Sequence, residues 1–186
     1  MVIVHLTERW MLGFVCVCLL SACTGEDTGP VVPPELERML ADEMILNLDN
    51  ILQRNGVREA VVRADTGYFW DDSTAVHVRG NVEIRSFNDE TGAPRALLKS
   101  EQARLDEADN SVTAFGNAVL MIVEIGREIR SAEIHYSPER NRIWSDSATC
   151  SKEGDKVMEG SGFSADLEFT LVEVTNPRSR PGGDCF

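Results

Sequence analysis

The chain has 186 residues, with 18 Lys or Arg against 31 Asp or Glu, so its formal net charge is −13. Such a surface repels phosphate backbones, which argues against nucleic acid as a partner, and a lipid ligand would be held mainly through its acyl chains. The apolar residues are mainly Val, Ile, Leu and Ala, which favours one β-rich domain of ordinary size.

Residues 1–22 have the pattern of a signal peptide. Arg9 precedes an apolar run over residues 10–20, which is too short to span a bilayer. The run ends in Leu20-Ser21-Ala22-Cys23, which resembles the lipobox of bacterial lipoproteins. We therefore expect Cys23 to carry a lipid that anchors the mature chain to a membrane. A plain signal peptide or a short membrane anchor is the alternative.

Residues 23–34 are rich in Gly and Pro and are expected to form a flexible tether. Two of the five cysteines leave with the signal peptide and Cys23 carries the lipid, which leaves Cys150 and Cys185. In an oxidising envelope these two thiols either pair, tying the C-terminal tail to a late strand, or remain free. The spacing of the cysteines fits no metal motif.

Residues 35–55 are predicted to form a short helix or an edge segment. Asn55-Gly56 follows as a helix stop, whereas Ile45-Leu46 also supports a strand. Apolar residues recur every four positions, as expected for one face of a helix. These residues are Leu36, Leu40, Met44, Leu48 and Leu52.

From residue 56 to residue 175 the chain alternates between apolar segments and turn sequences. Turns spaced about 8–12 residues apart are typical of an all-β sandwich, roll or barrel. Gly116-Asn117 interrupts one strand and Gly80-Asn81 interrupts another, and such glycines mark bends or bulges where a sheet curls. Residues 176–186 are expected to be a disordered tail.

The sequence offers no persuasive catalytic group, metal site or cofactor motif. His77 and His135 each stand alone in a strand and are expected to be surface residues. Gly160-Ser161-Gly162 superficially suggests a nucleophile elbow, but no helix follows it. Asp71-Asp72 is typical of a solvated turn. We therefore predict a binding or structural protein rather than an enzyme.

Large apolar residues of the strands are the candidates for an inner surface that binds a ligand. They could form an ordinary filled core, or an elongated groove that holds acyl chains. The candidates are Val78, Ile84, Leu98, Phe115, Leu120, Ile122, Ile134, Trp144 and Phe163.

Several segments, taken in order, resemble the LptC family, the membrane-anchored periplasmic component of lipopolysaccharide export. The resemblance covers about residues 55–170, and no single segment is specific by itself. The segments are Gly56-Val57-Arg58, Ala64-Asp65-Thr66-Gly67-Tyr68, Ala114-Phe115-Gly116-Asn117-Ala118-Val119, Ser131-Ala132-Glu133-Ile134-His135-Tyr136, Asn141-Arg142-Ile143-Trp144-Ser145-Asp146 and Glu159-Gly160-Ser161-Gly162-Phe163-Ser164-Ala165-Asp166.

This resemblance implies a twisted antiparallel β-jellyroll, open along one side, through which lipopolysaccharide acyl chains pass. It implies that the N-terminal edge receives lipopolysaccharide from an inner-membrane ABC transporter. The C-terminal edge, near residues 160–170, would pair strand to strand with a periplasmic bridge protein. A structural or assembly lipoprotein with a filled β core is the alternative.

Two features depart from the family and bear on localisation. Familiar members have a transmembrane helix where this chain has a lipobox, and the residue after Cys23 is Thr24 rather than the Asp that retains some lipoproteins at the inner membrane. The resemblance favours the inner membrane, facing the periplasm, and the outer membrane is the alternative.

Overall fold

The computed structural model describes residues 40–54, 56–88, 90–181 and 183–185. These residues belong to one compact unit. The expected signal peptide, Cys23 and the tether lie outside the described residues. Within the described part, no helix is long and apolar enough to cross a membrane.

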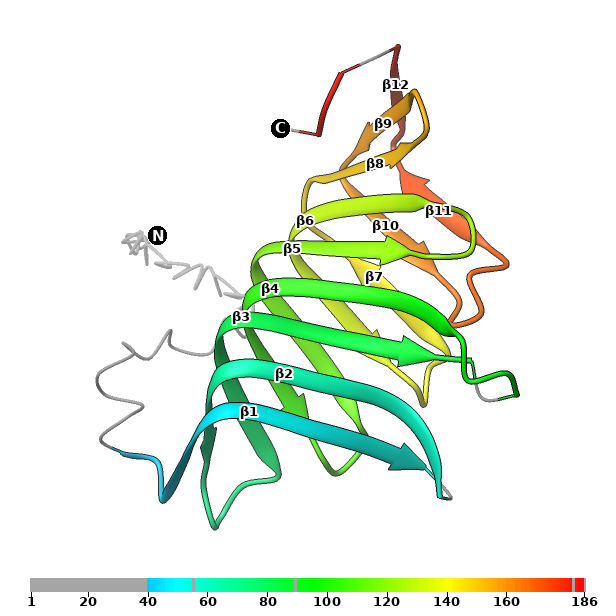
Figure 1. Ribbon diagram of the computed structural model, residues 1–186. Coiled ribbons are helices and arrows are strands. Elements are labelled where there is room, and N and C mark those ends of the chain that lie inside the picture. The colour runs from blue at the N-terminus through cyan, green and yellow to red at the C-terminus, as the bar shows by residue number, and fades with distance from the viewer. Residues whose placement is uncertain (1–39, 55, 89, 182, 186) are drawn as a thin grey trace, which may run out of the picture. The chain divides into compact units, whose positions relative to one another are not determined.

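Every element of the described part is a β-strand, and all paired strands run antiparallel (Figure 1). The six long strands β1 to β6 follow one another in chain order through a single sheet, and shorter strands extend it beyond β6. The strands are β1 (Glu43–Arg54), β2 (Val57–Phe69), β3 (Ala75–Phe87), β4 (Pro94–Asp106), β5 (Ser111–Ile122), β6 (Arg127–Ser137), β7 (Arg142–Ser145), β8 (Thr149–Glu153), β9 (Lys156–Gly160), β10 (Gly162–Ala165), β11 (Val172–Thr175) and β12 (Arg178–Pro181).

The long strands bend near their middle, so that their two halves lie in two facing layers (Figure 1). Pairing between neighbours is interrupted at this level, for example between Arg79 and Val82 in β3 and between Phe115 and Ala118 in β5. At β6 the sheet divides, because the first half of β6 pairs with β8 and the second half with β7. One layer continues through β7 and β10 to β11, and the other through β8 and β9 to β12. We call them the β11 layer and the β12 layer.

Beyond β6, pairs of short strands take the place of single bent strands. β7 leads into β8, β9 into β10 and β11 into β12, and in each pair one strand lies in each layer. β9 and β10 are separated only by Ser161. β11 and β12 are separated by Asn176, whose φ of 49° is in the left-handed region, and Pro177. Each pair therefore acts as one bent rung, and the sheet is a stack of such rungs.

The Gly-Asn steps form the bends of β3 and β5, and a carboxylate of the preceding strand holds each of them. Asn117 Nδ2 donates a 2.6 Å hydrogen bond to Glu101 Oε1, and Asn81 Nδ2 donates a 2.9 Å hydrogen bond to Asp65 Oδ2. Gly116 has a φ of +79°, and a Cβ atom there would lie 2.8 Å from the Cβ of Glu101. Glycine is therefore required at this position both by the backbone conformation and by the close approach of β4.

The two layers enclose one apolar core, which explains why the sheet stays folded on itself. Side chains alternate between the two faces of each strand, and the inward positions are Val, Ile, Leu and Ala. The largest core side chains that are less than 2% exposed are Val62, Val78, Val82, Leu120, Ile122, Ile129, Ile134 and Phe163.

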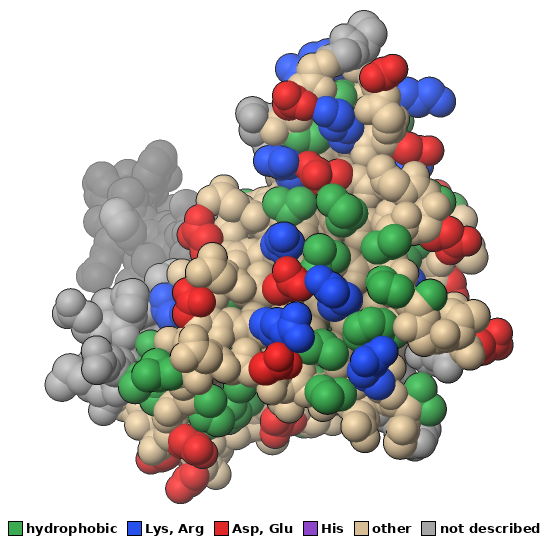
Figure 2. All heavy atoms as spheres, viewed as in Figure 1, with side chains coloured by type: hydrophobic (Ala, Val, Ile, Leu, Met, Phe, Trp, Pro, Cys, Tyr) green, Lys and Arg blue, Asp and Glu red, His purple; other side chains and the backbone are tan. Residues whose placement is uncertain are grey.

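The outer face of the β12 layer is covered by ion pairs and scattered apolar side chains (Figure 2). Asp49, Arg63, Glu83 and Lys99 occupy successive positions across β1 to β4. Arg63 Nε lies 3.0 Å from Asp49 Oδ2, and Lys99 Nζ lies 3.8 Å from Glu83 Oε2. Exposed pairs of this kind add little stability, but they keep this face solvated.

Of the two structures expected for residues 35–55, a short helix or an edge segment, the chain forms the edge strand β1 over Glu43–Arg54. A spacing of four residues also keeps side chains on one face of a strand, so Leu48 and Leu52, which face the core, fit either structure. Pairing with β2 decides in favour of the strand, since the antiparallel ladder between them extends from Glu43 to Arg54. Residues 35–39 lie outside the described residues.

The expectation of a disordered tail at residues 176–186 also needs correction. β12 pairs with β9 from Arg178 to Pro181, and Cys185 forms a disulfide with Cys150. The sheet therefore extends beyond the expected domain of residues 56–175 at both ends, through β1 and through β12. The expectation of an all-β antiparallel jellyroll open along one side is confirmed.

Replacing Gly116 tests the importance of the bend. Gly116→Ala should lower the free energy of unfolding by about 2–4 kcal/mol, because it adds backbone strain and a clash with Glu101. Gly126→Ala is the matched control: its φ is +62°, but no atom lies within 4 Å of the added methyl group. It should cost only the strain, about 1 kcal/mol. Urea denaturation of both variants measures the difference, and equal losses would contradict the proposed role of the contact.

Candidate functional site

The two histidines of the described residues lie among aromatic side chains on the outer face of the β11 layer. His135 stacks on Trp144 with ring centroids 5.2 Å apart, and its Nδ1 lies 3.2 Å from the hydroxyl of Thr113. The ring of His77 meets that of Trp70 edge to face at 4.9 Å. The described residues contain no cluster of His, Cys, Asp and Glu side chains that could hold a metal ion.

A cleft of about 220 Å³ lies between the two layers on the open side of the jellyroll. The β12 layer contributes Ala60, Ile84, Ala96, Leu98 and Leu120, and the β11 layer contributes Val112, Tyr136 and Ile143. A second recess, of about 30 Å³, shares Leu52, Asn110 and Val112 with this cleft and reaches Leu48 of β1. The cleft is below the usual size of a small-molecule pocket, about 300–1,000 Å³.

Two polar contacts join the layers across the mouth of the cleft. The Tyr136 hydroxyl, in the β11 layer, donates a 3.2 Å hydrogen bond to Glu59 Oε1 in the β12 layer. Arg95 Nη1, in the β12 layer, donates a 3.4 Å hydrogen bond to the carbonyl of Leu167, which follows β10. A neutral hydrogen bond contributes about 0.5–1.5 kcal/mol, and one to a charged group about 1.5–3 kcal/mol. The mouth is therefore held by weak, separable contacts.

The loop between β10 and β11, residues 166–171, covers part of the mouth. Leu167 and Phe169 pack against the core, and both line the cleft. Phe169 has a φ of 57°, a strained conformation for an aromatic residue. Asp166 holds the loop, because its carboxylate accepts hydrogen bonds from the Thr170 hydroxyl and from the backbone N–H of Leu171.

The charge of Asp166 strengthens this loop. Desolvation raises the pKa of Asp166, but the hydrogen bonds from Thr170 and Leu171 outweigh it and hold the pKa below its ordinary value. The carboxylate is therefore ionised at neutral pH, as its acceptor role in the loop requires.

The structure divides the nine candidates for the inner surface into two groups. Seven lie in the core between the layers, and three of these, Ile84, Leu98 and Leu120, also line the cleft. Phe115 and Trp144 lie on the outer face, which corrects the expectation that they line the inner surface. Their neighbours Ala114 and Ser145 point inward instead, 0% and 1% exposed. Strand alternation, not side-chain size, decides which residue faces the core. The other four core residues are Val78, Ile122, Ile134 and Phe163.

Sequence reasoning missed the groups that close the mouth. Glu59 and Tyr136 are 77 residues apart in the chain, and Arg95 and Leu167 are 72 apart. No local pattern connects either pair, because the contacts exist only once the layers face each other.

The comparisons with known proteins concern the fold. No family model matches the chain, and no curated protein matches it. A solved structure does match: the crystal structure of LptH, the LptA homologous periplasmic component of the lipopolysaccharide transport device from Pseudomonas aeruginosa. The alignment has a TM-score of 0.51 and 18% sequence identity, and it covers 63% of this chain and 82% of LptH. The chain therefore has the fold of LptH, an antiparallel β-jellyroll open along one side.

Proposed function

We propose that the chain is a non-catalytic, periplasm-facing component of lipopolysaccharide transport in the bacterial envelope. The observation that carries this proposal is a folded sheet with two apolar layers, open along one side, whose mouth is held by separable contacts. LptH, which has the same fold, is a periplasmic component of a lipopolysaccharide transport device.

Acyl chains are the part of lipopolysaccharide that this interior suits. Burying ten methylene groups contributes roughly 8 kcal/mol. Breaking the contacts of Tyr136 with Glu59 and of Arg95 with Leu167, each of which involves a charged group, costs roughly 3–6 kcal/mol together. The free energy gained by burying an acyl chain between the layers therefore exceeds the cost of breaking these contacts, if the loop of residues 166–171 moves aside. The net charge of −13 supports recognition through acyl chains rather than phosphates.

In this proposal the two ends of the sheet serve as the entry and exit. Lipopolysaccharide would arrive from an inner-membrane ABC transporter at the β1 end and leave to a periplasmic bridge protein at the other end. The exit edge differs from the one expected near residues 160–170, because β10 pairs with β7 on one side and β11 on the other. β11 pairs only with β10 among the described strands, so it is the edge that offers hydrogen bonds to a partner.

A structural or assembly lipoprotein remains the second candidate, and one observation favours it. The core residues fill most of the space between the layers, and the cleft holds only about 220 Å³. A protein with this interior could act as a rigid envelope component without carrying lipid.

Photo-crosslinking separates these two functions. A benzophenone amino acid at Phe169 or Tyr136, both in the cleft, should form adducts with lipopolysaccharide in cells. The same probe at Phe115, on the outer face of β5, is the matched control and should form none. Adducts are detected by immunoblotting for lipopolysaccharide after purification. Absence of adducts at both cleft positions, or equal labelling at Phe115, would favour the structural role.

The lipid anchor proposed at Cys23 has its own test. Cys23→Ala removes the thiol that would carry the lipid, so the protein should lose its acyl chains and accumulate in unprocessed or soluble form. Metabolic labelling with a palmitate analogue, together with membrane fractionation, measures both effects. Cys18→Ala, within the expected signal peptide, is the control and should be processed normally. Unchanged processing and membrane retention of Cys23→Ala would rule out the lipobox.

A further inference from the structure

The last rung of the sheet presents two unlike edges. β11 has the sequence Val-Glu-Val-Thr, and β12 has the sequence Arg-Ser-Arg-Pro. Each of them pairs with only one strand among the described residues, β11 with β10 and β12 with β9. Short strands, charged side chains and proline are the devices by which proteins prevent strand addition at a sheet edge. β12 combines all three, and β11 lacks proline and carries one charge.

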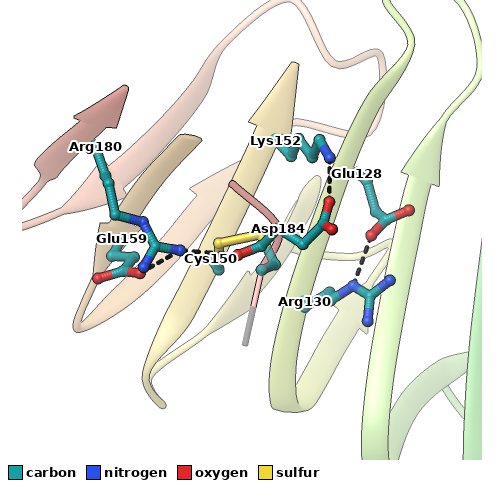
Figure 3. Close-up of a disulfide and its surroundings, with 8 residues drawn as sticks. Glu128, Arg130, Cys150, Lys152, Glu159, Arg180 and Asp184 are labelled. Atoms are coloured by element: carbon teal, nitrogen blue, oxygen red, sulfur yellow. Dashed lines mark hydrogen bonds and ion pairs between the residues drawn. A yellow bond between two sulfur atoms is a disulfide. The ribbon is translucent and has the colours of Figure 1, made fainter. Parts of the chain in front are cut away.

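A disulfide and two ion pairs fasten β12 and the residues after it to the sheet (Figure 3). Cys185 is bonded to Cys150 of β8, with Cα atoms 5.7 Å apart, and the two residues are 3% and 0% exposed. Lys152 Nζ lies 2.5 Å from Asp184 Oδ1, and this ammonium group holds the pKa of Asp184 below its ordinary value.

Arg180 links the strand to the residues that follow it. Its Nη2 lies 3.3 Å from Glu159 Oε1 of β9 and donates a 2.8 Å hydrogen bond to the carbonyl of Asp184. The end of a chain usually frays unless something holds it. Here covalent and ionic links hold a strand that is only four residues long.

β12 pairs with β9, and without β12 the backbone groups along that edge of β9 would be free to pair with another strand. Its residues are Lys156-Val157-Met158-Glu159-Gly160. Val157 is 1% exposed and forms a small second core with Cys150 and Cys185, whereas Met158 is 39% exposed. Loss of the tail would uncover this second core as well as the backbone groups of β9. An antiparallel pair of two such strands, centred on Met158, is self-complementary.

We propose that β12, pinned by the Cys150–Cys185 disulfide, is a built-in edge cap that prevents a second copy of this chain from pairing through β9. β12 occupies the pairing position beside β9. The outer edge of β12 itself resists strand addition, because this strand is short, charged and contains proline. Strand addition at this end of the sheet is thereby limited to β11. The capping role does not depend on lipopolysaccharide transport, and its test uses no lipid.

The test compares the full chain in detergent with its Cys150→Ala/Cys185→Ala variant. Hydrogen exchange of β9 and β12 should become about tenfold faster in the variant, while the amides of β4 and β5 stay as protected as before. Native mass spectrometry should show monomers for the wild type and dimers for the variant. Adding Met158→Lys to the variant places a charge on the bare edge and should restore the monomer.

Each other outcome overturns the proposal. If β12 stays protected in the variant, the disulfide does not pin it. If β12 is released but the protein stays monomeric, or if Met158→Lys leaves the dimer intact, then β12 does not prevent pairing of a second copy through β9. Should the variant lose protection in β4 and β5, Arg180→Pro tests the cap with the disulfide in place, because Pro181 takes the outward-facing backbone position and Arg180 therefore directs its N–H toward β9. Arg180→Ala, which removes the same side chain but keeps the N–H, is its control. Arg180→Pro should dimerise and Arg180→Ala should not; monomers in both would contradict the cap.

Discussion

The structure depends on the bend that each rung makes at the same level of the sheet. Hydrogen bonds join every strand to its neighbours, so one strand can bend only where the next one bends too. In β3 the level is set by Gly80-Asn81, which Asp65 holds. In β5 it is set by Gly116-Asn117, which Glu101 holds. The buried hydroxyls of Ser131 and Ser145, 2.8 Å apart, lie where the sheet divides between β6 and β7. The bend brings two apolar surfaces face to face and thereby creates the core.

A sheet folded in this way is closed at the bend and open on the opposite side. Backbone hydrogen bonds cannot join the layers there, so the mouth is closed by side chains and by a loop. The contact between Tyr136 and Glu59, that between Arg95 and Leu167, and the packing of Phe169 are together much weaker than the strand ladders. This difference in strength means that the layers can separate at the open side without unfolding the sheet.

The same construction leaves free edges at the two ends of the stack, and the chain treats them differently. β1 exposes Leu46 and Ile51, 62% and 51% exposed, and is neither short nor proline-containing. At the other end both strands are four residues long, but β11 is open, whereas β12 is rich in arginine, contains proline and is fastened through Cys185. Because an uncovered edge pairs with any available strand, such asymmetry selects where contacts can form.

The sequence by itself determined the all-β class, the bends at the two Gly-Asn steps and most of the core. Alternation of apolar residues and left-handed glycines are local properties, readable without knowing which strands pair. It could not decide between helix and strand for β1, since Leu48 and Leu52 suit either period. It also misplaced Phe115 and Trp144, because the face of a residue follows from register and changes where a strand bends. Only the tertiary structure decided these points, the β11 edge and the closing of the mouth, since they depend on pairings between residues far apart in the chain.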